Sequence, residues 1–321
     1  MSNTATVLAF DFGASSGRAI RAVYDGQNLN YEEIHRFENI PIEKDGHLCW
    51  DVETLLKEIH TAIQKAGTFD SLGFDTWGVD FGLLDTDGHL LANPVHYRDA
   101  RTNGKPEQAA ARMPAEELYA HTGNQIMVIN TLFQLLALRE QDPELLQKTA
   151  QILFMPDLFA ALLGAEPVCE RSIASTSQML DPRTGQWSRE VLAVYGLNEK
   201  HFAPIVASGT VTGTLANGAK IIAVAGHDTQ CASAAMPCAE EDAEHTVFLS
   251  CGTWSLLGTE LDASILTADS CQSGLSNELG ANGKINYLKN IIGLWLIQES
   301  RREYKRRGQA YSFAELEQQA L

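Results

Sequence analysis

The sequence predicts an α/β fold with two domains that face each other across a cleft. Strand-like apolar stretches alternate with a helical pattern over residues 7–84, and the strand pattern returns over 203–258. Residues 7–16 and 247–255 also share one plan: an apolar strand, a small turn with glycine, and hydroxyl residues. Such a repeat indicates two copies of one ancestral unit. Chance similarity between two β-hairpins is the alternative.

The first elements follow from local patterns. Asp25-Gly26 is a hairpin turn signal, and Leu55, Leu56, Ile59 and Ile63 recur with helical spacing. The expected order is strand, turn, strand, strand, helix and two further strands, at 7–11, 12–17, 18–23, 29–37, 51–63, 71–76 and 79–84.

The middle of the chain, 105–200, is mostly helical in pattern. A strand at 221–225 is expected to lead into a small-residue helix at 230–236, followed by an acidic linker at 237–244. Two strands at 246–250 and 254–259 and a helix at 286–299 complete the prediction. We therefore expect domains at 1–240 and 241–321. Because only about 60 residues follow the second hairpin, too few for another copy of the first domain, we expect the chain to be truncated.

Composition narrows the class of protein. The chain has 321 residues, 45% hydrophobic, which suffices for two domains with full cores. Its net charge of −17 disfavours nucleic acid and anionic membrane surfaces as partners. No apolar run approaches the roughly 20 residues of a membrane span, and the N-terminus lacks the pattern of a signal peptide. Six scattered cysteines without a CxxC pair favour a reduced, cytoplasmic protein.

The segment from Asp11 to Arg18 contains two glycines and two serines. Glycine permits close backbone approach, so successive N–H groups of such a turn can hold phosphate oxygens. Asp11, at the end of a strand, can hold Mg²⁺ directly or through water. An ordinary Gly/Ser hairpin turn with a solvated aspartate is the alternative.

The segment Gly226-His227-Asp228-Thr229 follows a strand and opens a helix. A carboxylate at this position lies where α/β proteins place ligands, and Asp228 could accept the proton of an attacking hydroxyl group. The alternative is that Asp228 only caps the helix.

Two other polar clusters stand out. In residues 74–80, Asp75 and Asp80 could accept hydrogen bonds from sugar hydroxyls while Trp77 packs on an apolar sugar face; the alternative is a strand end with a core tryptophan. Residues 97–101 form a second polar cluster, which could equally be a surface salt-bridge run. On the expected helix 286–299, Asn290 and Gln298 border a buried face and need partners from the protein or a ligand.

Six motifs in this order closely resemble the L-rhamnulose kinases of the FGGY carbohydrate-kinase family. They are DFGASSGR, DTWGVDF, YRDARTNG, GHDT, SCGTWSLLG and YLKNIIGLWLIQES, and they extend along the whole chain. The resemblance implies the duplicated ribonuclease H-like fold of actin-type ATPases, closing on ATP and a sugar. It implies Mg²⁺, small-molecule partners, a monomer or homodimer, and transfer of the terminal phosphoryl group of ATP to the 1-hydroxyl of L-rhamnulose.

The resemblance also implies roles for individual residues. Asp228 would be the catalytic base. The sugar would be bound by Gly78, His227, Asp228, Thr229 and Asn290. ATP would be bound by Ala14, Ser15, Ser16, Gly17, Arg18, Thr253 and Gln298. The later glycine-rich adenosine site of the family has no counterpart before Leu321, and Tyr97 stands where many relatives carry tryptophan.

Two alternatives stay open. The chain could phosphorylate another ketose such as L-fuculose or L-xylulose, because a methyl and a hydroxymethyl group differ by only about 1–3 kcal/mol in a pocket. It could also be a non-catalytic sugar-binding remnant, since the sugar-side motifs are present and part of the ATP side is missing.

Overall fold

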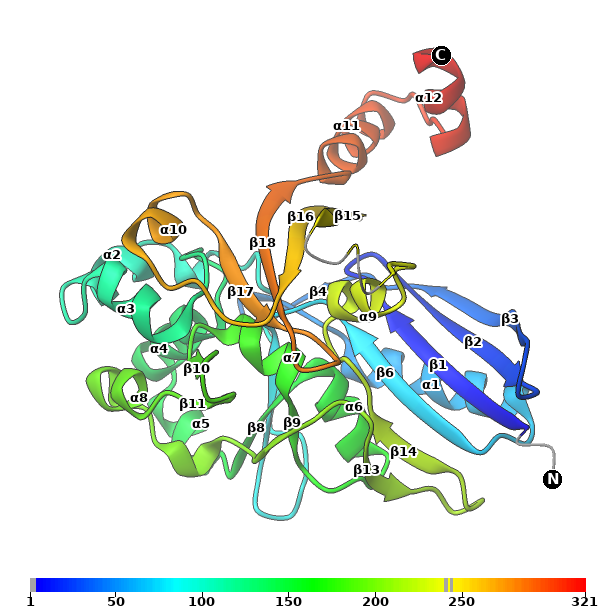
Figure 1. The fold of residues 1–321 in the computed structure, drawn as a ribbon, viewed down its shortest axis with the longest axis horizontal. Coiled ribbons are helices and arrows are strands. Elements are labelled where there is room, and N and C mark those ends of the chain that lie inside the picture. Colours follow the sequence, from blue (N-terminus) through cyan, green and yellow to red (C-terminus); the bar gives the residue numbers. More distant parts are fainter. Residues whose placement is uncertain (1–3, 240–241, 243–244) are drawn as a thin grey trace.

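The structure is a computed structural model that describes residues 4–239, 242 and 245–321. A six-stranded sheet with the order β13-β14-β6-β1-β2-β3 forms the centre of the first half (Figure 1). Its strands are β1 (Ala5–Phe12), β2 (Ser16–Tyr24), β3 (Leu29–Glu38), β6 (Ser71–Thr76), β13 (Thr210–Thr214) and β14 (Lys220–Ala223). β6 pairs in parallel with both β1 and β14, and the other pairs are antiparallel. The carboxyl ends of the parallel strands therefore share one edge, where open α/β sheets bind ligands.

Aromatic packing joins this sheet to the helices that cover it. Phe10 stacks on Phe74 with ring centroids 4.8 Å apart, and Phe12 stacks on Phe159 of α6 (Met155–Leu162) at 4.9 Å. α1 (Val52–Ala66) begins where the Asp51 carboxylate accepts the Thr54 N–H at 3.1 Å. Its buried residues recur with helical spacing, as the sequence indicates.

Between β6 and β13 the chain forms a largely helical body that holds a second cluster of buried side chains. Its helices are η1 (Ala100–Thr102), α2 (Lys105–Ala110), α3 (Ala115–Thr122), α4 (Thr131–Gln141), α5 (Pro143–Lys148), α7 (Arg171–Ala174), η2 (Ser175–Ser177), α8 (Arg189–Tyr195) and η3 (Glu199–His201). Short strands in and beside it are β4 (Ile42–Lys44), β5 (His47–Cys49), β7 (Phe81–Leu84), β8 (Gln151–Phe154), β9 (Cys169–Glu170), β10 (Leu180–Asp181), β11 (Gln186–Trp187) and β12 (Ile205–Val206).

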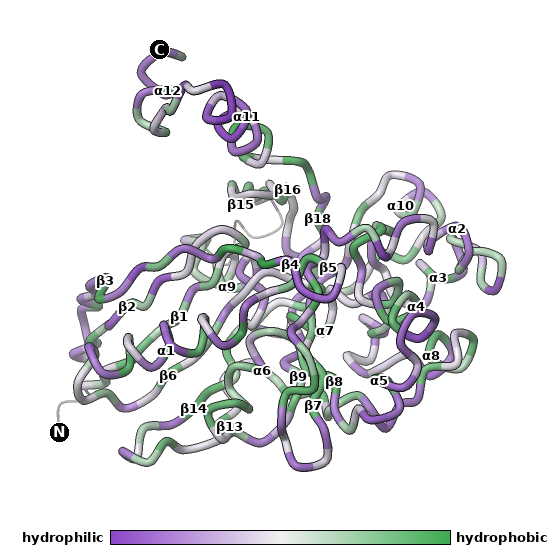
Figure 2. Tube along the Cα trace, turned by 180° about the vertical axis from the view of Figure 1, so that it is seen from behind, coloured by the Kyte–Doolittle hydropathy of each residue, from purple (hydrophilic) through white to green (hydrophobic). Residues whose placement is uncertain are grey.

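A second sheet follows α9 (Asp228–Ala234). Its antiparallel strands have the order β15-β16-β18-β17, with bounds Phe248–Cys251, Trp254–Leu261, Ile285–Ile292 and Ser276–Leu279. α10 (Ala268–Gln272) lies against α3, whereas α11 (Trp295–Arg306) and α12 (Phe313–Ala320) extend away from the body (Figure 1). Figure 2 shows α11 as mostly hydrophilic. No helix in the described part of the chain is long and apolar enough to cross a membrane.

The expected helix at 286–299 is wrong in its first half. Residues 285–292 form β18, which is paired on both sides, with Asn290 opposite Leu256 and Leu288 opposite Ser276. The helix begins only at Trp295, because at Gly293 the chain passes close to the turn between β15 and β16. A Cβ on Gly293 would lie 2.8 Å from the Gly252 carbonyl oxygen. Isoleucines at 285, 291 and 292 suit a strand, and the apolar period alone was misleading.

Two smaller expectations also need adjustment. The strand expected at 79–84 begins at Phe81, because Val79 has a φ of 66° and turns the chain. For a β-branched residue this left-handed conformation is strained and needs support. Two hydrogen bonds provide that support. The Thr131 hydroxyl donates to the Val79 carbonyl, and the Val79 N–H donates to the Thr176 hydroxyl oxygen. The linker expected at 237–244 lies partly outside the described residues.

Candidate active site

A cavity of about 420 Å³ opens between the carboxyl edge of the first sheet and the second sheet. The turn between β1 and β2 lines it on one side, and the turn between β15 and β16 lines it on the other. The two hairpins that resemble each other in sequence thus contribute to one site. Of the expected site residues, the cavity is lined by Asp11, Ala14, Ser15, Ser16, Arg18, Gly78, His227, Asp228, Thr229, Thr253 and Asn290.

The β1–β2 turn is held open by its own backbone and by one buried asparagine. Gly13 N–H donates to the Ser16 carbonyl at 2.8 Å, and Asn39 Nδ2 donates to the Gly13 carbonyl at 2.9 Å. Asn39 N–H also donates to the Ser15 carbonyl at 3.1 Å. These bonds use carbonyl groups on the protein side of the turn. The turn residues that line the cavity can therefore offer hydroxyl and N–H groups to an anion.

Gly17 has a packing role in this turn. It does not line the cavity, and a Cβ at this position would lie 2.2 Å from the ring of Phe37. The phenyl ring therefore occupies the space of the missing side chain. Close packing against Phe37 explains why glycine is needed here.

Asp11 and Arg18 face each other across β1 and β2. Arg18 Nη2 lies 2.5 Å and Nε 2.8 Å from Asp11 Oδ2, and both side chains are partly exposed. Both contacts from Arg18 engage the same carboxylate oxygen, Oδ2, and Asp11 also lines the cavity. A carboxylate beside a turn that can offer N–H and hydroxyl groups to an anion fits the oxygen ligands that Mg²⁺ prefers.

The segment 226–229 follows β14 and is anchored on both sides. Thr76 N–H donates to the Gly226 carbonyl at 2.8 Å, and Gly226 N–H donates to the carboxylate of buried Glu170 at 3.0 Å. His227 occupies the N-cap position of α9 without a capping side-chain bond, and Asp228 is the first helical residue. The expected alternative that Asp228 serves as the cap is therefore wrong.

Asp228 lines the cavity and is partly exposed. Its side chain is 39% exposed, and its Oδ1 accepts the Thr229 N–H at 2.6 Å. Burial of the surrounding site raises the pKa of the Asp228 carboxyl, and the neighbouring His227 opposes this rise. A carboxylate with one oxygen held and a raised proton affinity is suited to take a proton from a bound hydroxyl.

Asp75 and Asp11 are register partners on parallel strands. Burial and then the negative charges of Asp11 and Asp228 raise the pKa of Asp75 well above its ordinary value. Asp75 does not line the cavity, so the expected contact between this residue and a sugar hydroxyl has no support from the geometry.

Asp80 is a structural residue, and its expected role as a sugar ligand is wrong. It is fully buried and accepts hydrogen bonds from Trp50 Nε1 at 2.6 Å, Trp77 Nε1 at 3.0 Å, Tyr97 N–H at 3.1 Å and Gln134 Nε2 at 2.9 Å. Burial raises its pKa to about 6, and these donors limit the rise. The carboxylate thereby fixes Trp77 and Tyr97, which both line the cavity.

The second sheet adds the opposite wall. Asn290 Nδ2 donates to Gln125 Oε1 at 3.4 Å at the cavity wall. Gln298 lies outside the cavity lining, where its Nε2 donates to Thr253 Oγ1 at 3.3 Å. Gln298 thus supports the β15–β16 turn through Thr253.

The cluster 97–101 is partly buried and reaches the second sheet, so the surface salt-bridge alternative is wrong. The guanidinium carbon of exposed Arg98 lies 5.1 Å, 5.5 Å and 4.9 Å from the ring centroids of Tyr97, Trp254 and Trp295. Three aromatic rings around one cation join the loop 97–101 to β16 and α11.

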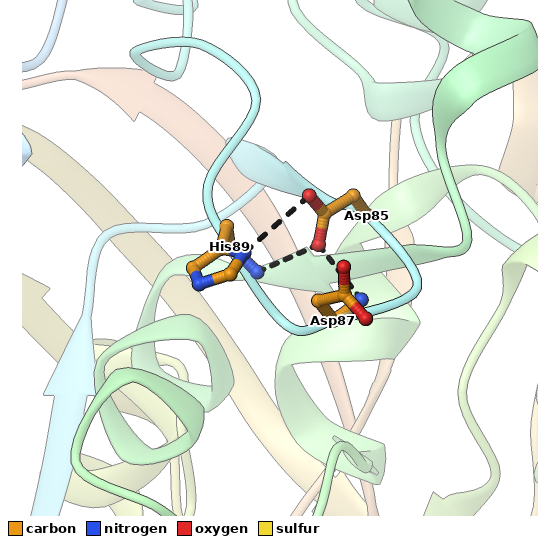
Figure 3. Close-up of side chains that lie close together, drawn as sticks. All are labelled: Asp85, Asp87 and His89. Carbon is orange, nitrogen blue, oxygen red and sulfur yellow. Dashed lines mark hydrogen bonds and ion pairs between the residues drawn. The ribbon is translucent and has the colours of Figure 1, made fainter.

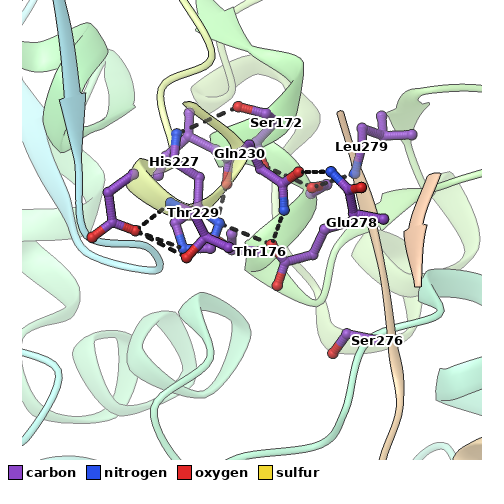
Figure 4. A network of polar contacts seen from close by, with 12 residues as sticks. Ser172, Thr176, His227, Thr229, Gln230, Ser276, Glu278 and Leu279 are labelled. Carbon is purple, nitrogen blue, oxygen red and sulfur yellow. Dashed lines mark hydrogen bonds and ion pairs between the residues drawn. The ribbon is translucent and has the colours of Figure 1, made fainter. Parts of the chain in front are cut away.

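Glu278, on β17, was not singled out from the sequence. It is 4% exposed, lines the cavity and contacts the segment 226–229 (Figure 4). The usable signal was a glutamate in the middle of a strand whose four residues are all buried, since such carboxylates need partners. That strand was not recognised in the sequence, so the signal was missed.

A second group of potential ligands lies far from this site. Asp85, Asp87 and His89 gather on the hairpin loop after β7 (Figure 3). Asp85 accepts the N–H groups of the other two residues at 2.9 Å, and these bonds suffice to explain the turn.

Comparison with known proteins identifies the fold. The FGGY family of carbohydrate kinases, N-terminal domain, matches residues 6–234, and the C-terminal domain of the same family matches residues 247–321. The chain belongs to the FGGY family of carbohydrate kinases. Xylulose kinase from Lactobacillus acidophilus has a similar structure, with a TM-score of 0.75 at 16% identity over 92% of this chain and 62% of that chain. This similarity confirms the expected two-domain, ribonuclease H-like fold.

FGGY proteins with closer sequences are also found. A rhamnulokinase from Bacteroides thetaiotaomicron is 41% identical over 92% of this chain, and one from Halalkalibacterium halodurans is 40% identical over 96%. These matches confirm the resemblance inferred from the six motifs. The chain spans 63% and 67% of the lengths of these two relatives.

Proposed function

We propose that this FGGY chain is part of an ATP-dependent kinase that phosphorylates the 1-hydroxyl of L-rhamnulose in the cytoplasm. The observation that carries the proposal is the position of Asp228. Its partly exposed carboxylate lies in a cavity that is bordered by the Gly13–Ser16 turn and by Thr253 on the opposite wall. Two relatives near 40% identity are named rhamnulokinases, which favours this sugar over the alternatives.

The proposed reaction needs one proton acceptor and good positioning. Asp228 takes the proton of the sugar 1-hydroxyl while that oxygen forms a bond to the terminal phosphorus of ATP. The bond from phosphorus to the bridging oxygen breaks, and ADP leaves. Since phosphoryl transfer requires little covalent assistance, orientation and charge neutralisation supply most of the rate.

We assign Gly78, His227, Thr229 and Asn290 to the sugar. We assign the segment Ala14–Arg18, together with Thr253, to the phosphates of ATP. Gly17 and Gln298 would act through the residues they pack against or bond, since they do not line the cavity. We also propose a domain boundary near residue 240.

Asp11 would hold Mg²⁺ through the oxygen that Arg18 leaves free. The ion would neutralise negative charge on the phosphate oxygens of ATP. The hydrogen bond from Arg18 keeps the Asp11 carboxylate at the edge of the turn. Both residues line the cavity, so both would lie beside the phosphates of ATP.

Asp228→Asn tests the assignment of the base. The change keeps the shape of the side chain and removes the proton acceptor, so phosphorylation should fall by about 10²–10⁴-fold while L-rhamnulose still binds. Asp87→Asn, on an exposed loop, is the matched control. Coupled ADP release measures turnover, and calorimetry measures sugar binding. Turnover within twofold of the unchanged protein would rule out Asp228 as the base.

The sugar is tested separately. Among L-rhamnulose, L-fuculose, L-xylulose and glycerol, the first should give the highest kcat/KM. A clear preference for L-fuculose or L-xylulose would favour the other ketose kinases. Sugar binding without any transfer, at saturating ATP and Mg²⁺, would favour the non-catalytic alternative.

A further inference from the structure

The carboxylate of Glu278 makes two hydrogen bonds to the segment that carries the proposed base. Its Oε2 lies 2.8 Å from His227 Nδ1 and accepts from Gln230 Nε2 at 2.8 Å (Figure 4). Asn286 Nδ2 in turn donates to Gln230 Oε1 and, at 2.9 Å, to the hydroxyl of Ser233. Glu278 of β17 and Asn286 of β18 therefore bond to residues at the start of α9 and along it, and they join the second sheet to this helix.

The surroundings of His227 strongly favour its protonated form. Burial by itself lowers the pKa of His227, but the Glu278 carboxylate, then Asp228 and Asp75, raise it to about 9. These three carboxylates approach from three elements, β17, α9 and β6, and Asp11 of β1 lies beyond Asp228. A buried carboxylate such as Glu278 also requires a partner of opposite charge.

The second nitrogen of the same ring borders the sugar side of the cavity. His227 Nε2 lies 3.5 Å from Asp228 Oδ1. A Cβ on Gly78 would lie 3.4 Å from Nε2, so the glycine leaves this nitrogen accessible. When Glu278 engages Nδ1 of an imidazolium, Nε2 carries a proton and can only donate.

We infer that Glu278 is a positioning residue that keeps His227 a fixed, doubly protonated donor beside Asp228. This inference rests on the proposed kinase function and deepens it. With His227 charged, the ring cannot compete with Asp228 for the proton of the attacking hydroxyl, and its Nε2–H can donate to a sugar oxygen. The second sheet thus acts on the proposed sugar site in two ways: Asn290 lines the cavity, and Glu278 orients His227 of the first domain.

Glu278→Gln tests the inference because glutamine keeps the size and can still bond to Gln230 but cannot balance the charge of His227. The matched control is Glu260→Gln on β16 of the same sheet, where the carboxylate contacts Asn282 on the surface. His227→Gln serves to assign the imidazole signals of His227 among the nine histidines. Thermal unfolding of each variant checks that it folds.

The first readout does not depend on turnover. Imidazole NMR signals followed against pH should show the His227 pKa fall by more than one unit in Glu278→Gln and stay unchanged in Glu260→Gln. Calorimetry should show L-rhamnulose binding weakened at least about tenfold at pH 8. An unchanged His227 titration in a folded Glu278→Gln protein would overturn the inference, whatever the enzyme phosphorylates.

The second readout concerns the reaction. In Glu278→Gln the alkaline fall of kcat/KM should move toward neutral pH, and Glu278→Asp should restore part of the original profile. A residue that only stabilised the fold would lower the unfolding temperature and leave the pH profile in place, which contradicts the inference. If no protein variant turns over any sugar, the proposed function fails, while the NMR and binding results still decide the role of Glu278.

Discussion

Trp77 Nε1 donates a hydrogen bond of 3.0 Å to Oδ2 of Asp80, so a fully buried carboxylate orients an indole ring at the cavity wall. The same oxygen accepts from Trp50, whose ring centroid lies 4.0 Å from that of Trp77. Gln134 binds the other carboxylate oxygen. The shape of this wall therefore depends on one carboxylate that does not itself line the cavity.

Replacing this carboxylate should affect stability first. Asp80→Asn places an amide donor among four N–H donors, so at least one becomes unpaired, and we expect the free energy of unfolding to fall by about 2–4 kcal/mol. Denaturant titration at pH 7.5 measures it. Asp85→Asn is the control: this partly exposed carboxylate accepts two backbone N–H groups, and its replacement should cost less than half as much. Equal losses for the two variants would contradict the structural role of Asp80.

The pH dependence of stability should report the buried imidazolium. The pKa of His227 is raised from 6.5 to about 9, so its contribution is fully present below pH 6.5 and is lost as the pH rises through 9. The free energy of unfolding should fall by on the order of 3 kcal/mol over this range. The raised pKa of Asp75 changes stability in the same direction. Urea titrations at pH 6, 7.5 and 9 test this, and stability that increases toward pH 9 would refute it.

Gly78 should control access to His227. A Cβ there would meet Thr176 Cγ2 at 3.3 Å, so alanine needs a small adjustment, whereas the branched side chain of valine would extend over the imidazole. We expect Gly78→Val to weaken L-rhamnulose binding at least about tenfold and Gly78→Ala to weaken it less. Calorimetry measures both. Equal affinity of the valine variant and the unchanged protein would exclude Gly78 from the sugar wall.

Arg98 should stabilise the contact between the loop 97–101 and the second sheet. Each aromatic ring around its guanidinium contributes about 0.5–1 kcal/mol at an exposed site, so Arg98→Gln should loosen β16 and α11. Hydrogen exchange of amides in 295–306 should accelerate several-fold relative to those of α1. Arg189→Gln, which removes an exposed arginine paired with Glu199, is the control and should leave this exchange unchanged.

The fold was largely predictable because its strands carry strong local patterns. The expected strand 71–76 coincides with β6, and the helix expected at 51–63 is the first part of α1. The failure at 286–299 has a definite cause. Its residues suit both a helix face and a strand paired on both sides, and only the neighbouring strands β16 and β17 decide between them.

The candidate site was predictable where glycine and acidic residues stand at strand ends, as in 11–18 and 226–229. The roles of Asp75 and Asp80 were not, because Trp50 and Gln134, which determine the environment of Asp80, are remote in sequence. The partner of Glu278 could not be identified for the same reason, since 51 positions separate it from His227.

That separation of 51 positions also sets an order of events during synthesis. At about 5–20 residues per second, residues 226–229 leave the ribosome several seconds before Glu278 is available. Until then His227 lacks its hydrogen-bond partner on the second sheet, and among the carboxylates that raise its pKa only Asp228 and Asp75 are in place. The hydrogen bond that fixes the imidazole ring of His227 would therefore form only after β17 has joined the second sheet.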